Sequence, residues 1–224
     1  MIRALVFDLD GLILDTESTV YATWQAVYRD HGVALPLDRW QQAIGSDETH
    51  FEPLSFLLAQ RPDLDLSALH ERRRVLRERL LAQLGPCAGV AERLGEARAR
   101  GLRLAVASSS ERAWVEHHLD RLGFLPHFSA LRCREDVARV KPDPALYRSA
   151  VEALGVPAEH AVAFEDSPNG VAAAVAAGLR CVAIPGPMTR GLCFDAAHLC
   201  LESLAARTLD EILASVGGGL RPSA

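Results

Sequence analysis

The chain has 224 residues, a net charge of −5 and a pI of about 5.9, with 49% hydrophobic and 24% charged residues. These values are those of an ordinary globular protein, and the acidic balance offers no basic surface for nucleic acid or an anionic membrane. The five cysteines are scattered without a Cys-x-x-Cys pair, which argues for reduced thiols and against a disulfide framework or a zinc site.

We expect a cytoplasmic, monomeric protein that does not bind membranes. The sequence enters an apolar strand without a signal-peptide pattern. Its longest apolar stretch, near 171–179, is too short and too rich in Ala and Gly to span a bilayer.

The first predicted element is a strand over residues 2–8. Its apolar run 4–7 (ALVF) is followed by Asp8, Asp10 and the turn residue Gly11. Because side chains alternate along a strand, both carboxylates project to the same side of the chain at its C-terminal end. Two acids this close suit a nucleophile with a general acid/base, a hard-metal site, or both. A strand followed by a polar turn is the alternative, since Asp-Gly is a common turn pair.

Residues 16–84 carry helical patterns only. Leu69, Leu76, Leu80 and Leu84 recur near helical spacing, and strand signals return only after 85–86 (GP). We interpret this stretch as an inserted lid or cap. The Arg/Glu run 71–79 within it is interpreted as a solvated face with spaced ion pairs, and a clamp for an anionic substrate is the alternative.

Beyond residue 86, short apolar strands alternate with helices. Strands are predicted over 102–107, 129–133, 161–164, 181–184 and 199–201, and helices near 88–99, 112–122, 144–154 and 168–177. This alternation predicts an α/β fold with a parallel sheet covered on both faces. The expected architecture is therefore a Rossmann-like parallel sheet core with an inserted α-helical cap domain.

Two polar signals follow strands in this half of the chain. Residues 108–110 (SSS) come directly after a strand and offer hydroxyls and backbone N–H groups to an anion, although Ser is also a common helix N-cap. Lys141 precedes Asp143, a predicted N-cap, and Pro144, a predicted first helical residue. The lysine therefore stands beside a helix N-terminus, where anions bind well, although a surface lysine before a turn is the alternative.

A second carboxylate pair, Glu165 and Asp166, ends another strand. Ser167 is predicted to cap the helix that Pro168 opens. Adjacent acids there suit Mg²⁺, which prefers oxygen ligands; the alternative is a helix N-terminus that favours acids through its dipole. Together these signals place carboxylates, hydroxyls and an ammonium at the edge where open parallel sheets bind ligands.

With these motifs in order, the chain resembles the haloacid dehalogenase-like (HAD) hydrolase superfamily, and most closely its capped phosphatase and β-phosphoglucomutase-like subgroup. Residues 8–17 (DLDGLILDTE) match the first motif, Ser108 the second, Lys141 the third and 165–167 (EDS) the fourth. The resemblance covers essentially the whole chain. It implies a catalytic core of residues 1–15 and 85–224 and a helical cap of residues 16–84.

The resemblance also implies a Mg²⁺-dependent reaction on a small-molecule phosphate ester. Asp8 would attack phosphorus and form an aspartyl-phosphate, and Asp10 would serve as general acid and then base. Mg²⁺ would be held by the Asp8 carboxylate, the Asp10 backbone carbonyl and Asp166, with Glu165 ligating directly or through water. The phosphoryl group would be held by Ser108, Ser109, Lys141 and the backbone N–H groups of Leu9 and Gly11.

Within the superfamily, Asp10 favours phosphoryl transfer over carbon–halogen cleavage, because an alkoxide leaving group needs an acid and a halide does not. A phosphatase on a sugar or polyol monophosphate is favoured over a β-phosphoglucomutase-type mutase. Glu48 and Glu111 stand where the resemblance places cations of that mutase, and Val20 stands where it places a histidine. Substrate specificity is assigned to a loop near 44–51, where Asp47, Glu48 and His50 either face substrate or form a solvated helix start.

Overall fold

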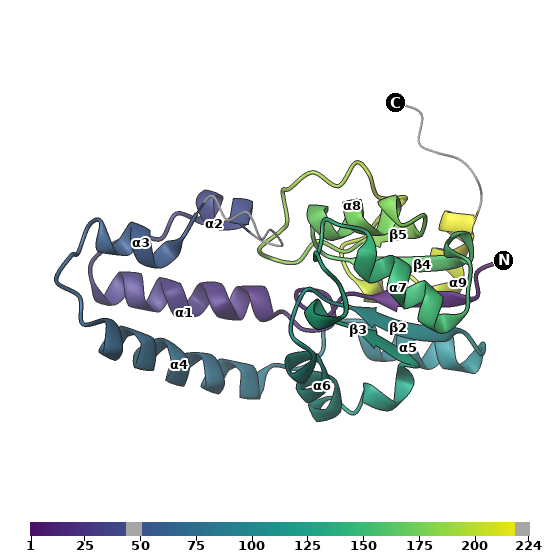
Figure 1. Ribbon diagram of the computed structural model, residues 1–224, viewed down its shortest axis with the longest axis horizontal. Helices are drawn as coiled ribbons and strands as arrows, with labels where there is room; N and C mark the ends of the chain where they lie inside the picture. The colour runs from purple at the N-terminus through teal and green to yellow at the C-terminus, as the bar shows by residue number, and fades with distance from the viewer. Residues whose placement is uncertain (44–50, 218–224) are drawn as a thin grey trace.

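The computed structural model describes residues 1–43 and 51–217. Six parallel strands form one sheet in the order β3-β2-β1-β4-β5-β6 (Figure 1). Their bounds are Ala4–Phe7 (β1), Arg103–Ala107 (β2), Ala130–Arg132 (β3), Ala161–Glu165 (β4), Arg180–Ala183 (β5) and Leu199–Cys200 (β6). All the predicted strands are found, so the parallel α/β fold is confirmed.

Helices cover both faces of the sheet because its strands bury side chains on both sides. Leu5 and Phe7 face a core shared with α5 (Val90–Ala99), α6 (Arg112–Arg121) and α9 (Leu209–Gly217). Ala4 and Val6 face the opposite core, shared with α7 (Ala145–Leu154) and α8 (Pro168–Ala176). Adjacent residues of β1 therefore alternate between two hydrophobic layers.

A separate helical unit lies between β1 and α5 in the chain. It comprises α1 (Thr16–Asp30), α2 (Leu37–Ala43), α3 (Pro53–Leu58) and α4 (Leu66–Gln83), and it extends away from the sheet in Figure 1. Its own core is formed by side chains that include Trp24, Tyr28, Trp40 and Leu57. The described part of residues 16–84 is helical, as predicted, and has no strand.

The Arg/Glu run on α4 forms the spaced ion pairs that were predicted for it. Arg74 pairs with Glu71 and Glu78 at 2.7 Å each, and Arg72 pairs with Asp30 at 3.0 Å. These contacts are solvent-exposed, so each contributes little to stability.

Some boundaries differ from those predicted. Strand β1 is shorter than the predicted 2–8, and α7 begins at Ala145 with Pro144 as its N-cap residue, although the Asp143 side chain still accepts from the Ala145 N–H at 3.0 Å. Helix α9 was not predicted, although Thr208 and Glu211 form reciprocal capping contacts at its start. Short 3-10 helices span Leu125–His127, Arg134–Asp136, Ala158–His160 and Leu204–Ala206.

Over the described ranges, no helix combines the length and apolarity needed to cross a membrane.

Candidate active site

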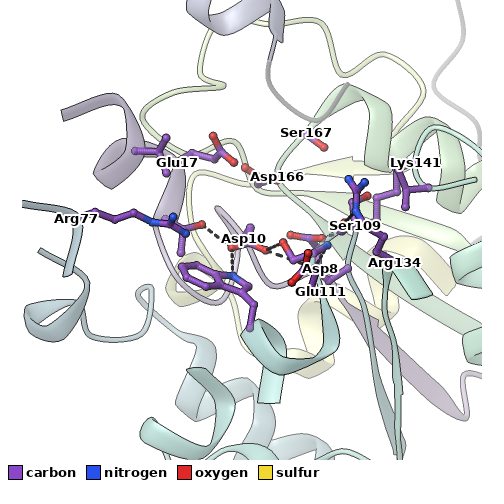
Figure 2. Close-up of a pocket in the computed structure, with 16 residues that line it drawn as sticks. Asp8, Asp10, Glu17, Arg77, Ser109, Glu111, Arg134, Lys141, Asp166 and Ser167 are labelled. Atoms are coloured by element: carbon purple, nitrogen blue, oxygen red, sulfur yellow. Dashed lines mark hydrogen bonds and ion pairs between the residues drawn. The ribbon is translucent and has the colours of Figure 1, made fainter. Parts of the chain in front are cut away.

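The carboxyl ends of the central strands bring the predicted site residues together. Because Phe7 is in register with both Val106 and Phe164, the residues that follow these positions on β1, β2 and β4 meet at one edge of the sheet. A cavity of about 570 Å³ opens there. Its lining includes predicted residues from all four motifs: Asp8, Asp10, Ser108, Ser109, Lys141 and Asp166. Figure 2 shows Asp8 and Lys141 on one side of this cavity and Arg77 and Glu17 on the other.

Lys141 is the centre of a buried hydrogen-bond network. Its Nζ donates to Asp8 Oδ1 and, at 2.6 Å, to Glu165 Oε1. The Tyr147 hydroxyl donates to the same Glu165 oxygen at 2.6 Å. Lys141 is also the only lysine in the chain, against 23 arginines. A compact ammonium on a narrow stem can enter this space between two carboxylates, whereas a guanidinium is broad and planar.

Burial dominates the electrostatics of this network. Desolvation raises the pKa of the Asp8 carboxyl from 3.8 to about 8, with Lys141 opposing the shift and Glu165 and Asp10 adding to it. Burial by itself would lower the pKa of Lys141, but the carboxylates of Asp8 and Glu165 outweigh it and raise that pKa above its ordinary value. Desolvation likewise raises the pKa of Asp166 well above its ordinary value, and the charge of Asp8 adds to this.

The residues present fit a divalent metal ion. Asp8, Glu165 and Asp166 are all buried and bring one oxygen each within 4.8 Å of the others. When all three carboxylates are ionised, the single ammonium of Lys141 leaves two negative charges uncompensated in a desolvated place, and a divalent cation would neutralise them. Hard oxygen ligands are those that Mg²⁺ prefers.

Two glycines make room for these carboxylates. A Cβ on Gly11 would lie 2.0 Å from Asp166 Oδ2, and a Cβ on Gly170 would lie 2.0 Å from Glu165 Cδ. Gly11 also has φ +89°, a conformation that favours glycine. Both oxygens of Glu165 already accept protein donors: Oε1 from Lys141 and Tyr147, and Oε2 from the Asp166 N–H at 3.1 Å. Glu165 therefore anchors Lys141 as well as facing the candidate metal site.

Asp10 lies beside this network and accepts hydrogen bonds on both carboxylate oxygens. Oδ1 accepts from the Thr16 hydroxyl at 2.8 Å and from Trp114 Nε1 at 2.9 Å. Oδ2 accepts from the Ser110 hydroxyl at 2.7 Å and from the Ser108 hydroxyl at 3.4 Å. Three of these partners, Thr16, Ser110 and Trp114, were not predicted as site residues, although Thr16 lies in the first motif and Ser110 in the triple serine.

The groups predicted to hold phosphate differ in whether they line the cavity or are used within the turn after β1. The side chain of Ser108 is buried in the cavity wall, and Ser109 also lines the cavity. The backbone carbonyl of Leu9 closes the turn by accepting from Ile13 at 2.9 Å. The Gly11 N–H donates to the Leu14 carbonyl at 2.6 Å, so in this structure it serves the turn and not an anion. The predicted specificity residues Asp47, Glu48 and His50 lie outside the described residues.

The cavity also holds charged residues that were not predicted as site residues, although Arg77 lies in the 71–79 run for which a clamp for an anionic substrate was the alternative. Arg77 comes from α4 and Arg134 from the turn after β3. Glu17 comes from the first turn of α1, and burial, with added repulsion from Asp10 and Asp15, raises its pKa to about 7. Glu17 belongs to the first motif and so had a signal in the sequence. Arg77 and Arg134 belong to no motif and reach the cavity only through the tertiary fold.

The chain is similar to known proteins over most of its length. A family model described as haloacid dehalogenase-like hydrolase matches residues 2–178. YhcW of Bacillus subtilis (strain 168), which is named as a phosphatase, is 39% identical over 214 residues that cover 95% of this chain and 97% of that protein.

Two crystal structures of CbbY from Rhodobacter sphaeroides are also similar. The complex with phosphate has a TM-score of 0.74 at 30% identity, covering 97% of this chain and 100% of that one. A point mutant in complex with xylulose-(1,5)bisphosphate has a TM-score of 0.71 at 29% identity, covering 92% of this chain and 96% of that one.

Proposed function

The chain belongs to the haloacid dehalogenase-like hydrolases, and from that premise we propose that it is a Mg²⁺-dependent phosphatase of a small phosphorylated metabolite. The observation that carries the proposal is the buried network in which Lys141 joins Asp8 to Glu165, beside Asp166 and Asp10. Such a network supplies a carboxylate nucleophile, a fixed cation and a candidate metal site at one point. Phosphoryl transfer needs these elements, because an anionic nucleophile must approach an anionic ester.

In the first step Asp8 is the nucleophile. One carboxylate oxygen of Asp8 forms a bond to phosphorus while the bond from phosphorus to the ester oxygen breaks. Protonated Asp10 gives its proton to the departing alkoxide. The products are an aspartyl-phosphate and an alcohol, and Asp10 is left as a carboxylate.

In the second step Asp10 acts as a base. It takes a proton from a water molecule whose oxygen attacks phosphorus, and the bond between phosphorus and Asp8 breaks. Inorganic phosphate is released, the Asp8 carboxylate is restored, and Asp10 is protonated again. The enzyme therefore returns to its starting state with one water consumed.

The other residues hold charge and geometry. Lys141 and Ser108 would neutralise and orient the phosphoryl oxygens, with Ser109 and the backbone N–H of Leu9 as further contacts; the Gly11 N–H is already used by the Leu14 carbonyl. Asp8, Asp166 and the Asp10 backbone carbonyl would hold Mg²⁺, with Glu165 ligating directly or through water. When bound, the ion supplies positive charge that lowers repulsion between the nucleophile and the phosphoryl group.

We assign residues 1–15 and 85–224 to the catalytic core and residues 16–84 to a cap that closes over the cavity. Thr16, the first residue of α1, bonds to Asp10, and Arg77 of α4 lines the cavity, so residues from both ends of the cap reach the site. Lids of this kind exclude water and complete the site. We further propose that the protein acts as a cytoplasmic monomer.

The proposed substrate is a sugar or polyol monophosphate. The second candidate is a sugar bisphosphate, which is favoured by Arg77 and Arg134 in the cavity wall and by the bisphosphate bound to the similar CbbY. A phosphomutase of the β-phosphoglucomutase type is the remaining alternative. Glu111 lines the cavity and disfavours it, because an acid there repels the second phosphate of a bisphosphate intermediate.

The test is phosphate release from a panel of phosphorylated sugars, polyols and nucleotides, with Mg²⁺ and with EDTA. We expect Mg²⁺-dependent release, with a preference for sugar or polyol monophosphates. A preference for bisphosphates that Arg77→Ala abolishes would select the second candidate. With β-glucose 1-phosphate primed by glucose 1,6-bisphosphate, isomerisation faster than phosphate release would select the mutase. No release from any ester would contradict the phosphatase proposal.

A further inference from the structure

Trp114 is a cavity side chain that connects the predicted acid, Asp10, to helix α4 of the cap. It lies in the first turn of α6, lines the cavity, and donates its indole N–H to Asp10 Oδ1 at 2.9 Å. Neither the motifs nor the mechanism above gives it a role. The contact spans 104 residues of sequence, so only the tertiary fold creates it.

The Trp114 contact differs in kind from the other side-chain bonds to Asp10. Thr16, Ser108 and Ser110 all reach Asp10 through hydroxyls, which rotate and can either donate or accept. An indole N–H can only donate, and its direction is fixed by the plane of the ring. The indole therefore fixes where Oδ1 of Asp10 lies, whatever the hydroxyls do.

The ring of Trp114 is itself held from two sides. The guanidinium of Arg77, on α4, lies 4.8 Å from the ring centroid. The His118 ring, one helical turn along α6, packs edge-on at 4.1 Å between centroids. Figure 2 shows Arg77 extending from the cap side of the cavity toward Asp10. A residue of the cap thus contacts the same indole that holds the acid.

We propose that Trp114 is a positioning residue for Asp10, and that Arg77 couples the position of the cap to the orientation of this carboxyl group through the indole. The inference rests on the proposed function, because it takes Asp10 as the acid for the leaving group. An acid held by a rigid donor keeps its second oxygen in a defined place for the ester oxygen. Loss of that donor leaves Asp10 to be oriented by rotating hydroxyls alone.

The test compares leaving groups in the Trp114→Phe variant. Phenylalanine keeps an aromatic ring beneath Arg77 but removes the N–H. We expect kcat for an alkyl phosphate to fall by about 10-fold, the order of magnitude expected for the loss of one hydrogen bond, with KM little changed. For an aryl phosphate we expect a loss of about 2-fold or less, because a good leaving group needs little acid. Arg77→Ala should show the same selectivity with a smaller loss.

Two matched controls separate positioning from packing. The first control is Trp24→Phe. The Trp24 ring also packs against a guanidinium, that of Arg73, whose Cζ lies 3.5 Å from the ring centroid. Trp24 lies in the core of the cap and has no bond to Asp10. This variant should affect both ester classes equally. Arg79→Ala removes an exposed arginine from the same helix as Arg77 and should leave both rates unchanged.

Each outcome decides the question. Selective loss on the alkyl ester in Trp114→Phe, absent in the controls, supports the inference. An equal loss of kcat on both esters would mean that Trp114 only packs the site. Unchanged rates would mean that Asp10 is positioned without Trp114. Either result would overturn the inference and leave the proposed function standing. A wild-type protein that releases phosphate from neither ester would overturn the proposed function and the inference with it.

Discussion

Replacing Lys141 with methionine tests the buried charge balance of the site. Methionine has a similar length but no charge, and the variant leaves the chain without any lysine. The Lys141 side chain is 5% exposed, and its ammonium contacts Asp8 and Glu165, which are 8% and 0% exposed. Removing one partner of a buried charge network typically costs about 3–5 kcal/mol, because the remaining charges lose their compensation. We expect a loss of this size in the free energy of unfolding near pH 8 in EDTA.

The pH dependence of this loss has a defined sign. The folded pKa of Asp8, raised to about 8, exceeds the value of 3.8 for a free carboxyl. At this residue the folded state therefore binds more protons than the unfolded state between these values, and the contribution of Asp8 to the stability of the wild-type protein falls as pH rises from about 4 to about 8. Lys141 lowers the pKa of Asp8. In the variant the pKa of Asp8 is therefore higher, and the fall in stability with rising pH continues above pH 8. The difference in the free energy of unfolding between wild type and variant should therefore widen as pH rises above about 8.

The assay is urea unfolding of both proteins in EDTA across this pH range. The control is Arg139→Met, which removes a cation two residues away whose side chain is 83% exposed and pairs with Asp143 at 3.1 Å. That pair should contribute no more than about 1 kcal/mol at any pH. If Lys141→Met cost no more than the control, or if its cost did not change with pH, the charge balance described for the site would be wrong.

Three further predictions concern the metal, a glycine and a histidine. Phosphatase activity should vanish in EDTA, return with Mg²⁺ and be inhibited by Ca²⁺, whose larger and looser shell disturbs in-line geometry; full activity in EDTA would remove Asp166 from a metal role. Gly170→Ala should lower the free energy of unfolding by about 2 kcal/mol or more and reduce kcat, because the added Cβ meets Glu165. The control, Gly95→Ala in the open middle of α5, should raise the free energy of unfolding by up to about 1 kcal/mol. Equal effects of the two variants in urea unfolding would refute the close approach of Gly170 to Glu165. Burial, with repulsion from His117, lowers the pKa of His118 to about 4, so at this residue the folded state binds fewer protons than the unfolded state, and the contribution of His118 to stability should be lost as pH falls from about 6.5 to about 4. Because Asp8 acts in the opposite direction over this range, the test is the difference in the free energy of unfolding between wild type and His118→Phe, and a difference that did not change with pH would contradict the prediction.

Local sequence signals were enough to predict the sheet and most of the polar residues that gather at its carboxyl edge. The strands that end at Asp8 and Glu165 are short apolar runs followed by acids, and parallel strands bring their carboxyl ends to one edge. The pairing of Lys141 with Asp8 and Glu165 follows from that edge, although the sequence alone left a surface lysine as the alternative.

The remaining site residues depend on contacts between distant elements. Trp114 and Tyr147 lie on helices whose apolar spacing explains their burial equally well, so nothing local marks their bonds to Asp10 and Glu165. Arg77 lies in a run of charged residues that is mostly a solvated face, and its place over Trp114 depends on how α4 meets α6. Helix α9 had a readable capping pair and buried residues at Leu209, Ile212 and Val216, so its omission was an error of interpretation.

The covalent intermediate is the central claim, and trapping it is the most direct test. Wild-type enzyme is mixed with a turned-over phosphate ester and Mg²⁺, quenched in acid within one turnover, and analysed by peptide mass spectrometry. We predict one added phosphoryl group on the peptide that contains Asp8, and no such group in the Asp8→Asn variant, which should also lack turnover because an amide is a poor nucleophile. A wild-type enzyme that hydrolyses the ester without labelling this peptide, or an Asp8→Asn variant that retains more than about a tenth of wild-type kcat, would contradict the mechanism.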